Sequence, residues 1–170
     1  MSTWLVVGLG NPGPTYAHHR HNVGHMVADE LASRARTPFQ MPRGMRAETA
    51  TTRVTASGIG GVGADAERVV LVKPLTYMNE SGAAVGKVAA FHQVPADHVI
   101  VVHDELDIDP GQLRLKLGGG DNGHNGLKSM RSSFGTGDFY RVRAGIGRPP
   151  GRQEVADFVL SNYSTVERKE

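Results

Sequence analysis

Three short, continuous apolar runs divide the 170-residue chain, at residues 4–9 (WLVVGL), 68–73 (RVVLVK) and 99–103 (VIVVH). Runs of this length and composition are typical of strands that are buried on both faces of a sheet. Residues 47–55 alternate weakly between apolar and polar positions, whereas residues 112–117 and 141–146 alternate leucine or other apolar positions with basic ones. Alternation of this kind predicts strands with one exposed face.

Helical patterns separate these strands. Val23, Met26, Val27 and Leu31 follow i, i+3, i+4, i+8 spacing, which predicts a helix from about residue 22 to 36. We expect Asn22 to cap this helix. Further helices are predicted around Val85, Val88 and Ala89, with Ser81 as the cap, and over residues 125–133, while the glycine-rich segment 56–67 is predicted to form a flexible turn.

The order of these elements predicts one α/β domain over residues 1–170, with a twisted, mixed and largely parallel sheet flanked by helices on both faces. In such sheets ligands bind outside the carboxyl ends of the strands. We therefore expect the functional site at that edge of the sheet.

The composition of the chain excludes several kinds of functional site. The chain contains no cysteine, which excludes disulfides, a thiol nucleophile and a thiolate metal site. No stretch approaches the roughly 18 apolar residues of a membrane span, and no targeting segment is evident, so we expect a cytoplasmic protein. Residues 114–152 contain eight Lys and Arg residues but only two acidic residues, Asp121 and Asp138. This segment indicates either a basic surface for a polyanion or merely a solvated basic face.

Reactive side chains follow the predicted strand ends. Asn11 and His21 follow the first apolar run, Asn79 follows the second, Asp104 follows the third, and Asn125 follows the alternating strand that ends near residue 117. If the strands are parallel neighbours, one edge of the sheet collects a histidine, an aspartate and three asparagines.

These residue types suit hydrolysis by activated water. A neutral histidine can take a proton near pH 7, and His21 precedes a predicted helix start, where the dipole disfavours the imidazolium. Asp104 could fix the tautomer of that ring, and asparagine amides could donate to an oxyanion. Each residue alone could equally be a surface, turn or capping residue. No G-x-S-x-G motif supports a serine nucleophile.

Two further motifs suggest other functions. Gly8, Gly10 and Gly13 match the dinucleotide-binding pattern, but the predicted helix opens too late and no acidic residue ends a second strand at the required distance. His21 and His25 could bind a metal together with His18 or Asp104, although no H-E-x-x-H motif is present. Metal dependence would separate this second alternative from a metal-free mechanism.

Five segments together resemble the bacterial peptidyl-tRNA hydrolase family: GLGNPGPTYAHHRHNVG, KPLTYMNESG, HDELDIDPGQLRLKLGGG, GHNGLKS and YRVRAGIGRPPG. They span most of the chain in a compatible order. The resemblance implies hydrolysis of the ester that joins a peptide to the 3′-terminal ribose of tRNA, releasing tRNA for reuse in translation. It also implies a monomer that needs no metal or cofactor and no obligate protein partner.

Carried over by motif position, the resemblance makes His21 the general base and Asp104 its partner. Asn11, Asn79 and Asn125 would hold substrate and water.

The remaining roles also follow from motif position. Tyr16, Tyr77 and Met78 would shape the site for the peptide end, and Lys116 with Arg143 would contact a tRNA phosphate. Phosphate contacts position an RNA without reading its sequence, which gives the basic segment a purpose.

The sequence departs from the family pattern in two regions. The loop 118–126 reads GGGDNGHNG, with Asp121 and Asn122 where the family commonly has other residues. The family also usually continues into a long C-terminal helix, and by comparison with that pattern we expect this chain to lack the end of the helix.

Two other functional hypotheses remain open. One is an RNA-binding relative that does not hydrolyse its ligand, since a fold alone does not settle function. The other is a metal-dependent esterase or peptidase for small substrates, which the basic residues Lys116, Arg141 and Arg143 disfavour.

Overall fold

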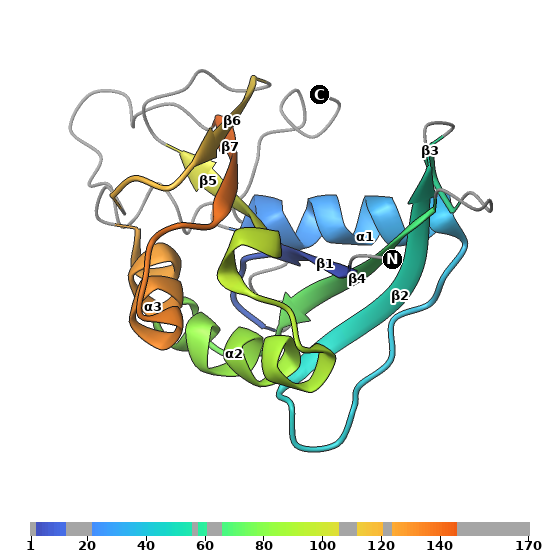
Figure 1. The fold of residues 1–170 in the computed structure, drawn as a ribbon, viewed down its shortest axis with the longest axis horizontal. Coiled ribbons are helices and arrows are strands. Elements are labelled where there is room, and N and C mark those ends of the chain that lie inside the picture. The colour runs from blue at the N-terminus through green and yellow to red at the C-terminus, as the bar shows by residue number, and fades with distance from the viewer. Residues whose placement is uncertain are drawn as a thin grey trace.

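The structure, a computed structural model, describes residues 3–12, 22–55, 58–60, 66–105, 112–120 and 124–145. Within these residues the chain forms a sheet with the strand order β3-β2-β4-β1-β5-β7-β6 (Figure 1). The central pairs β4–β1, β1–β5 and β5–β7 are parallel, whereas β3–β2, β2–β4 and β7–β6 are antiparallel. The predicted mixed sheet with a parallel centre is therefore confirmed.

Every predicted strand is present. The three continuous apolar runs are the central strands, because only a strand covered on both faces buries every side chain. The bounds are β1 Thr3–Gly8, β2 Ala47–Thr55, β3 Gly58–Ile59, β4 Glu67–Pro74, β5 Val99–Glu105, β6 Leu113–Leu117 and β7 Tyr140–Gly145. Two differences matter: the glycine-rich segment contains the short strand β3, and β5 runs two residues further than expected.

Helices cover both faces of the sheet, as predicted (Figure 1). On one face α1 packs Ala32 against Val69 and Leu71 of β4. On the other face α2 and α3 share a larger core with β1, β4 and β5 that includes Val85 and Met130. The helices are α1 Val23–Ala35, α2 Ser81–His92 and α3 Asn125–Phe134, with the short 3-10 turns η2 Met78–Glu80 and η3 Ala96–His98.

Both predicted helix caps are wrong. Asn22 occupies the N-cap position of α1, but its side chain makes no capping hydrogen bond and instead binds the backbone of Asn11. Ser81 is the first residue of α2, and its hydroxyl donates to the carbonyl of Met78. Tertiary partners outcompete the local cap in both cases, and both partners belong to the candidate site.

The strand β6 also differs from expectation. It forms the outer edge of the sheet, and all five of its residues are exposed rather than every second one. Among the described residues, no helix is long and apolar enough to cross a membrane.

Candidate active site

The carboxyl ends of β1, β4 and β5 lie side by side, because these strands are parallel neighbours. Asn11 follows β1, and Met78 begins the 3-10 turn η2 that follows β4. Asp104 is the second-to-last residue of β5. The structure thus brings together residues that lie 26 to 93 positions apart in the sequence. All three are buried.

Asn11 is held by three hydrogen bonds. Its backbone N–H donates to Asn22 Oδ1 at 2.8 Å, and its carbonyl accepts from Asn22 Nδ2 at 2.8 Å. Its side-chain Oδ1 accepts from the backbone N–H of Met78 at 2.7 Å. Because an N–H can only donate, this last bond fixes the orientation of the Asn11 amide. The Nδ2 group of Asn11 makes no hydrogen bond within the described part of the chain and is the donor left for a ligand.

Asp104 is bonded to a histidine that lies directly before α3. The Nε2 atom of His124 lies 2.6 Å from Oδ1 of Asp104, and both side chains are less than 10 % exposed, at 8 % and 4 %. The other ring nitrogen, Nδ1, accepts from the backbone N–H groups of Gly126 and Leu127 at 3.1 and 3.3 Å. A single imidazole therefore links the carboxylate to the N-terminus of α3.

A second buried histidine lies beside this pair. The Nδ1 atom of His103 lies 2.7 Å from the carbonyl oxygen of Asp104, so Nδ1 carries the hydrogen, and the two histidine rings meet edge to face at 5.1 Å. The Nε2 atom of His103 has no hydrogen-bond partner among the described residues. Burial lowers the pKa of His103 from 6.5 to about 3, so the ring is neutral.

Asn79 and Asn125 line one groove of about 460 Å³ between α2 and α3. Arg46, Glu80 and Lys128 line it as well, so the groove carries two cations and one carboxylate. Arg46 also forms an exposed ion pair with Glu80, with N and O atoms 3.3 Å apart.

Tyr77 and Met78 lie beside the groove and differ in exposure. Tyr77 is 55 % exposed, whereas Met78 is 4 % exposed and packs against Gly126, where a Cβ atom would come within 2.7 Å of its sulfur. Met78 is thus a fixed wall of the site, while the ring of Tyr77 is open to solvent. His21 and Tyr16, the predicted base and the other aromatic residue, lie outside the described residues.

Lys116 and Arg143 lie on neighbouring antiparallel strands. The register pairs Arg114 with Arg143 and Lys116 with Arg141, so all four basic residues share one face of β6–β7 and Lys116 is a diagonal neighbour of Arg143. We call this set the phosphate face, after the role that the resemblance implies for Lys116 and Arg143. The Nε atom of Arg143 lies 3.5 Å from Glu105, which is the residue after Asp104. The phosphate face is therefore connected to the carboxylate site through one strand end.

Arg141 is a correction to the predicted basic surface. It is 3 % exposed, and its guanidinium donates to the carbonyl oxygens of Gly119, Gly120 and Gly137 while lying 4.6 Å over the ring of Phe139. Its role in the structure is to hold the glycine loop against the sheet. A guanidinium has five N–H donors in a fixed fork, which suits it to several carbonyls at once.

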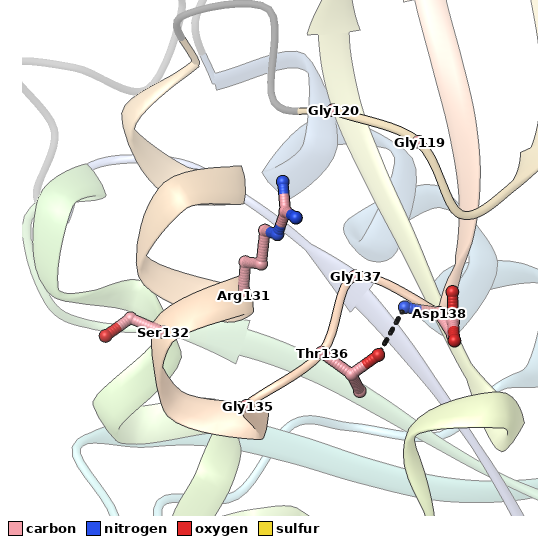
Figure 2. Close-up of a pocket in the computed structure, with 8 residues that line it drawn as sticks. All are labelled: Gly119, Gly120, Arg131, Ser132, Gly135, Thr136, Gly137 and Asp138. Atoms are coloured by element: carbon pink, nitrogen blue, oxygen red, sulfur yellow. Dashed lines mark hydrogen bonds between the residues drawn. The ribbon is translucent and has the colours of Figure 1, made fainter.

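A polar hollow of about 650 Å³ opens beside the glycine loop (Figure 2). The side chain of Arg131 extends from α3 towards Gly120, and the backbone N–H of Asp138 donates to the hydroxyl of Thr136 at 3.1 Å (Figure 2). A Cβ at Gly119 would lie 2.9 Å from Nζ of Lys116, so the lysine amine rests against the same loop. The hollow adjoins the phosphate face.

The competing motifs have structural explanations for their described members. A Cβ at Gly8 would lie 2.1 Å from the carbonyl oxygen of Gly24, and a Cβ at Gly10 would lie 2.6 Å from the ring of His25. These glycines let α1 pack closely on β1. His25 directs Nε2 to the carbonyl of Pro74 at 3.1 Å, and burial lowers its pKa to about 4. Among the described residues, no three metal-binding side chains cluster.

The fold and this edge define an α/β protein with a buried carboxylate–imidazole pair among asparagine side chains. The family model "Peptidyl-tRNA hydrolase" matches residues 5–170. Peptidyl-tRNA hydrolases of Cutibacterium acnes and Streptomyces avermitilis are 57 % and 58 % identical to the chain, over 99 % and 98 % of its length and 84 % and 79 % of their own. The crystal structure of the Acinetobacter baumannii peptidyl-tRNA hydrolase superposes with a TM-score of 0.84 at 36 % identity, covering 98 % of this chain and 79 % of that one. The chain belongs to the peptidyl-tRNA hydrolase family, as its motifs predicted.

Sequence reasoning missed two residues of this edge. His124 was not among the predicted site residues, although it directly precedes Asn125, because its bond to Asp104 spans 20 positions. Asn22 was interpreted only as a helix cap, although its two hydrogen bonds hold the backbone of Asn11. The R-H-N motif that contains Asn22 was the available signal.

Proposed function

We propose that the chain hydrolyses the ester between a peptide and the 3′-terminal ribose of tRNA, with water activated by His21. Family membership over residues 5–170 supports hydrolysis of peptidyl-tRNA. The observation that carries the catalytic proposal is the meeting of Asn11, Met78, Asp104 and His124 at one edge of the sheet. These residues come from four of the matching motifs.

In the proposed reaction the neutral His21 ring removes a proton from water, and the oxygen attacks the ester carbonyl carbon. The carbon–oxygen bond to the ribose then breaks, and the ribose oxygen takes the proton from the His21 imidazolium. The products are a peptide carboxylic acid, which ionises, and tRNA with a free terminal hydroxyl. Asp104 stabilises the imidazolium that forms between these two steps.

The asparagines supply neutral donors in this proposal. The Nδ2 group of Asn11 points to the developing oxyanion or to the attacking water, because its Oδ1 is already engaged by Met78. Asn79 and Asn125 bind the substrate in the groove that they share. Tyr16, Tyr77 and Met78 surround the peptide end.

Lys116 and Arg143 bind a phosphate of the tRNA in this proposal. Their position as diagonal neighbours on one face supports a shared ligand. Arg143 uses only Nε for Glu105, and its two terminal nitrogens make no hydrogen bond with other described residues. A guanidinium held from behind by a carboxylate is pre-oriented for an anion.

We further propose that the protein acts in the cytoplasm as a monomer, with no obligate protein partner and no resident metal or cofactor. This fits a translation-related reaction whose substrate is a peptidyl-tRNA. Sedimentation of the purified protein at micromolar concentration tests the oligomeric part: a single species of about 18 kDa is expected.

The decisive experiment is turnover of an N-blocked aminoacyl-tRNA by the wild type and by His21→Ala, each with and without a chelator. We expect the variant to lose about 100-fold or more in kcat, since a general base contributes 10²- to 10⁴-fold, and the chelator to change little. His92→Ala, a histidine at the end of α2, is the matched control. Retention of tRNA without release of peptide would favour the RNA-binding alternative, and loss of turnover on chelation that zinc restores would favour the metal-dependent one.

A further inference from the structure

His124 is the described residue that contacts both the catalytic carboxylate and the N-terminus of α3. Its Nδ1 accepts two backbone N–H groups, from Gly126 and Leu127, and serves as the side-chain cap of α3. Its Nε2 lies 2.6 Å from Oδ1 of Asp104. Both ring nitrogens are therefore committed within the protein.

These contacts determine where the ring hydrogen sits. A backbone N–H can only donate, so Nδ1 must present its lone pair to Gly126 and Leu127. The ring hydrogen is then on Nε2, where it is donated to Asp104. A doubly protonated ring would point an N–H from Nδ1 at two amide hydrogens and remove the cap from α3.

We propose that His124 is a positioning residue for the hydrolysis, held as the neutral Nε2–H tautomer by the N-terminus of α3 so that it fixes one oxygen of the Asp104 carboxylate. The proposal rests on the function proposed above. A neutral donor orients the carboxylate without adding a positive charge, so Asp104 keeps its full negative charge for the general base. Two charges within hydrogen-bond distance would instead neutralise each other.

The groups that face His124 within the described part of the chain support this assignment. From β5 these are Asp104 and the edge of the His103 ring, and from α3 they are backbone N–H groups. His103 is neutral, because it donates Nδ1–H to the Asp104 carbonyl and its burial lowers its pKa. Neither histidine therefore places a cation beside the carboxylate.

The same contact also positions a substrate-binding residue. Asn125 is the first residue of α3 and directly follows His124. Since the cap holds the first turn of α3 to the ring, and the ring is bonded to Asp104, the amide of Asn125 is placed relative to the catalytic carboxylate. His124 is thereby excluded as the base, because its one lone pair is used by the cap.

Two variants separate the two contacts. Asparagine is among the preferred N-cap residues, so His124→Asn can still accept the N–H groups of α3, but it is too short to reach Asp104. His124→Ala loses both contacts. We expect kcat to fall about tenfold in both variants with KM within about twofold, as for loss of one hydrogen bond to a charged group. The melting temperature should fall in His124→Ala and recover in His124→Asn.

Several results would overturn the proposal. Wild-type kcat in His124→Asn would mean that the bond to Asp104 does not matter. A rise in KM with unchanged kcat would mean that His124 contacts the substrate. Failure of His124→Asn to recover the melting temperature would mean that the cap does not hold the ring.

A readout independent of activity tests the tautomer itself. Long-range ¹H–¹⁵N correlation spectra of histidine-labelled protein, recorded at the pH of the turnover assay, should show the Nε2–H pattern for His124, assigned by its absence in His124→Asn. An Nδ1–H tautomer or an imidazolium under these conditions would refute the inference. Lack of hydrolysis by the wild type would instead refute the proposed function and leave the tautomer measurement interpretable.

Discussion

The carboxylate site and the phosphate face are built in opposite ways, although a single strand end connects them. At the carboxylate site, Asn11, Asp104 and His124 are almost fully buried and held by hydrogen bonds of 2.6–3.3 Å. On the phosphate face, Arg114 and Lys116 are exposed on an edge strand, and the adjoining hollow is open. Only Arg141 there is buried.

The roles proposed for the two regions explain the difference. A reacting carbonyl and a single water need donors fixed to within a fraction of an ångström, and burial strengthens each electrostatic interaction. A phosphate is a strong, nearly spherical charge that long side chains can follow from solvent. We therefore expect substitutions in the first region to lower kcat and substitutions in the second to raise KM.

The largest effect is expected at the carboxylate. Asp104→Asn keeps the shape of the side chain and an oxygen for His124, but removes the charge that stabilises an imidazolium. We expect kcat for N-blocked aminoacyl-tRNA to fall by about 100-fold or more with little change in KM. Asp97→Asn, an exposed position, is the matched control. Near-normal kcat in Asp104→Asn would show that the buried carboxylate is structural only.

A smaller loss is expected at the amide. Asn11→Asp retains an oxygen for the N–H of Met78 but replaces the free Nδ2 donor with a negative oxygen. Because a donor to the oxyanion is lost, kcat should fall by up to about 100-fold, while the melting temperature changes little. An unchanged kcat, or a loss of kcat that unfolding of the variant explains, would contradict the role of Asn11 as a donor to the oxyanion.

On the phosphate face the expected effect is on binding. Substituting Lys116 and Arg143 together by Gln should raise KM about tenfold and reduce the slope of log KM against log salt concentration by about 0.7–0.9, since the contact with one tRNA phosphate is lost. Hydrolysis of a short ester without RNA should not change.

The matched control removes the same charge elsewhere. Arg53→Gln with Arg68→Gln acts on an exposed cross-strand pair of β2 and β4, away from β6–β7. Equal salt slopes for the two double variants would mean that only net charge matters.

The smallest effect concerns stability in acid. The pKa of His103 is lowered in the folded protein to about 3 from 6.5, so the unfolded chain binds the extra proton and the free energy of unfolding falls as the pH drops below about 6.5. His103→Asn can keep a donor for the Asp104 carbonyl without titrating. Urea unfolding at several pH values should give a shallower pH dependence for this variant, with a remainder from His25, whose pKa is lowered in the same direction. An unchanged pH dependence would contradict the burial of a neutral ring.

The sequence by itself determined the architecture and which edge of the sheet carries the candidate site. Continuous apolar runs predicted β1, β4 and β5 because strands covered on both faces cannot alternate. The residues after those strands, Asn11, Asn79 and Asp104, were predicted to meet because parallel strands share a carboxyl edge.

Only the tertiary structure decided which partner each polar group takes. Asn22 and Ser81 have the side chains of helix caps, but closer partners across the fold bind them instead. Arg141 alternates with apolar residues, which is the pattern of an exposed basic position. In the structure it is buried, because its guanidinium donates to carbonyl oxygens of the glycine loop. His124 meets Asp104 because α3 docks its first turn beside β5. Local patterns report which face a residue occupies, whereas hydrogen bonds between distant segments depend on distances that exist only after the chain has packed.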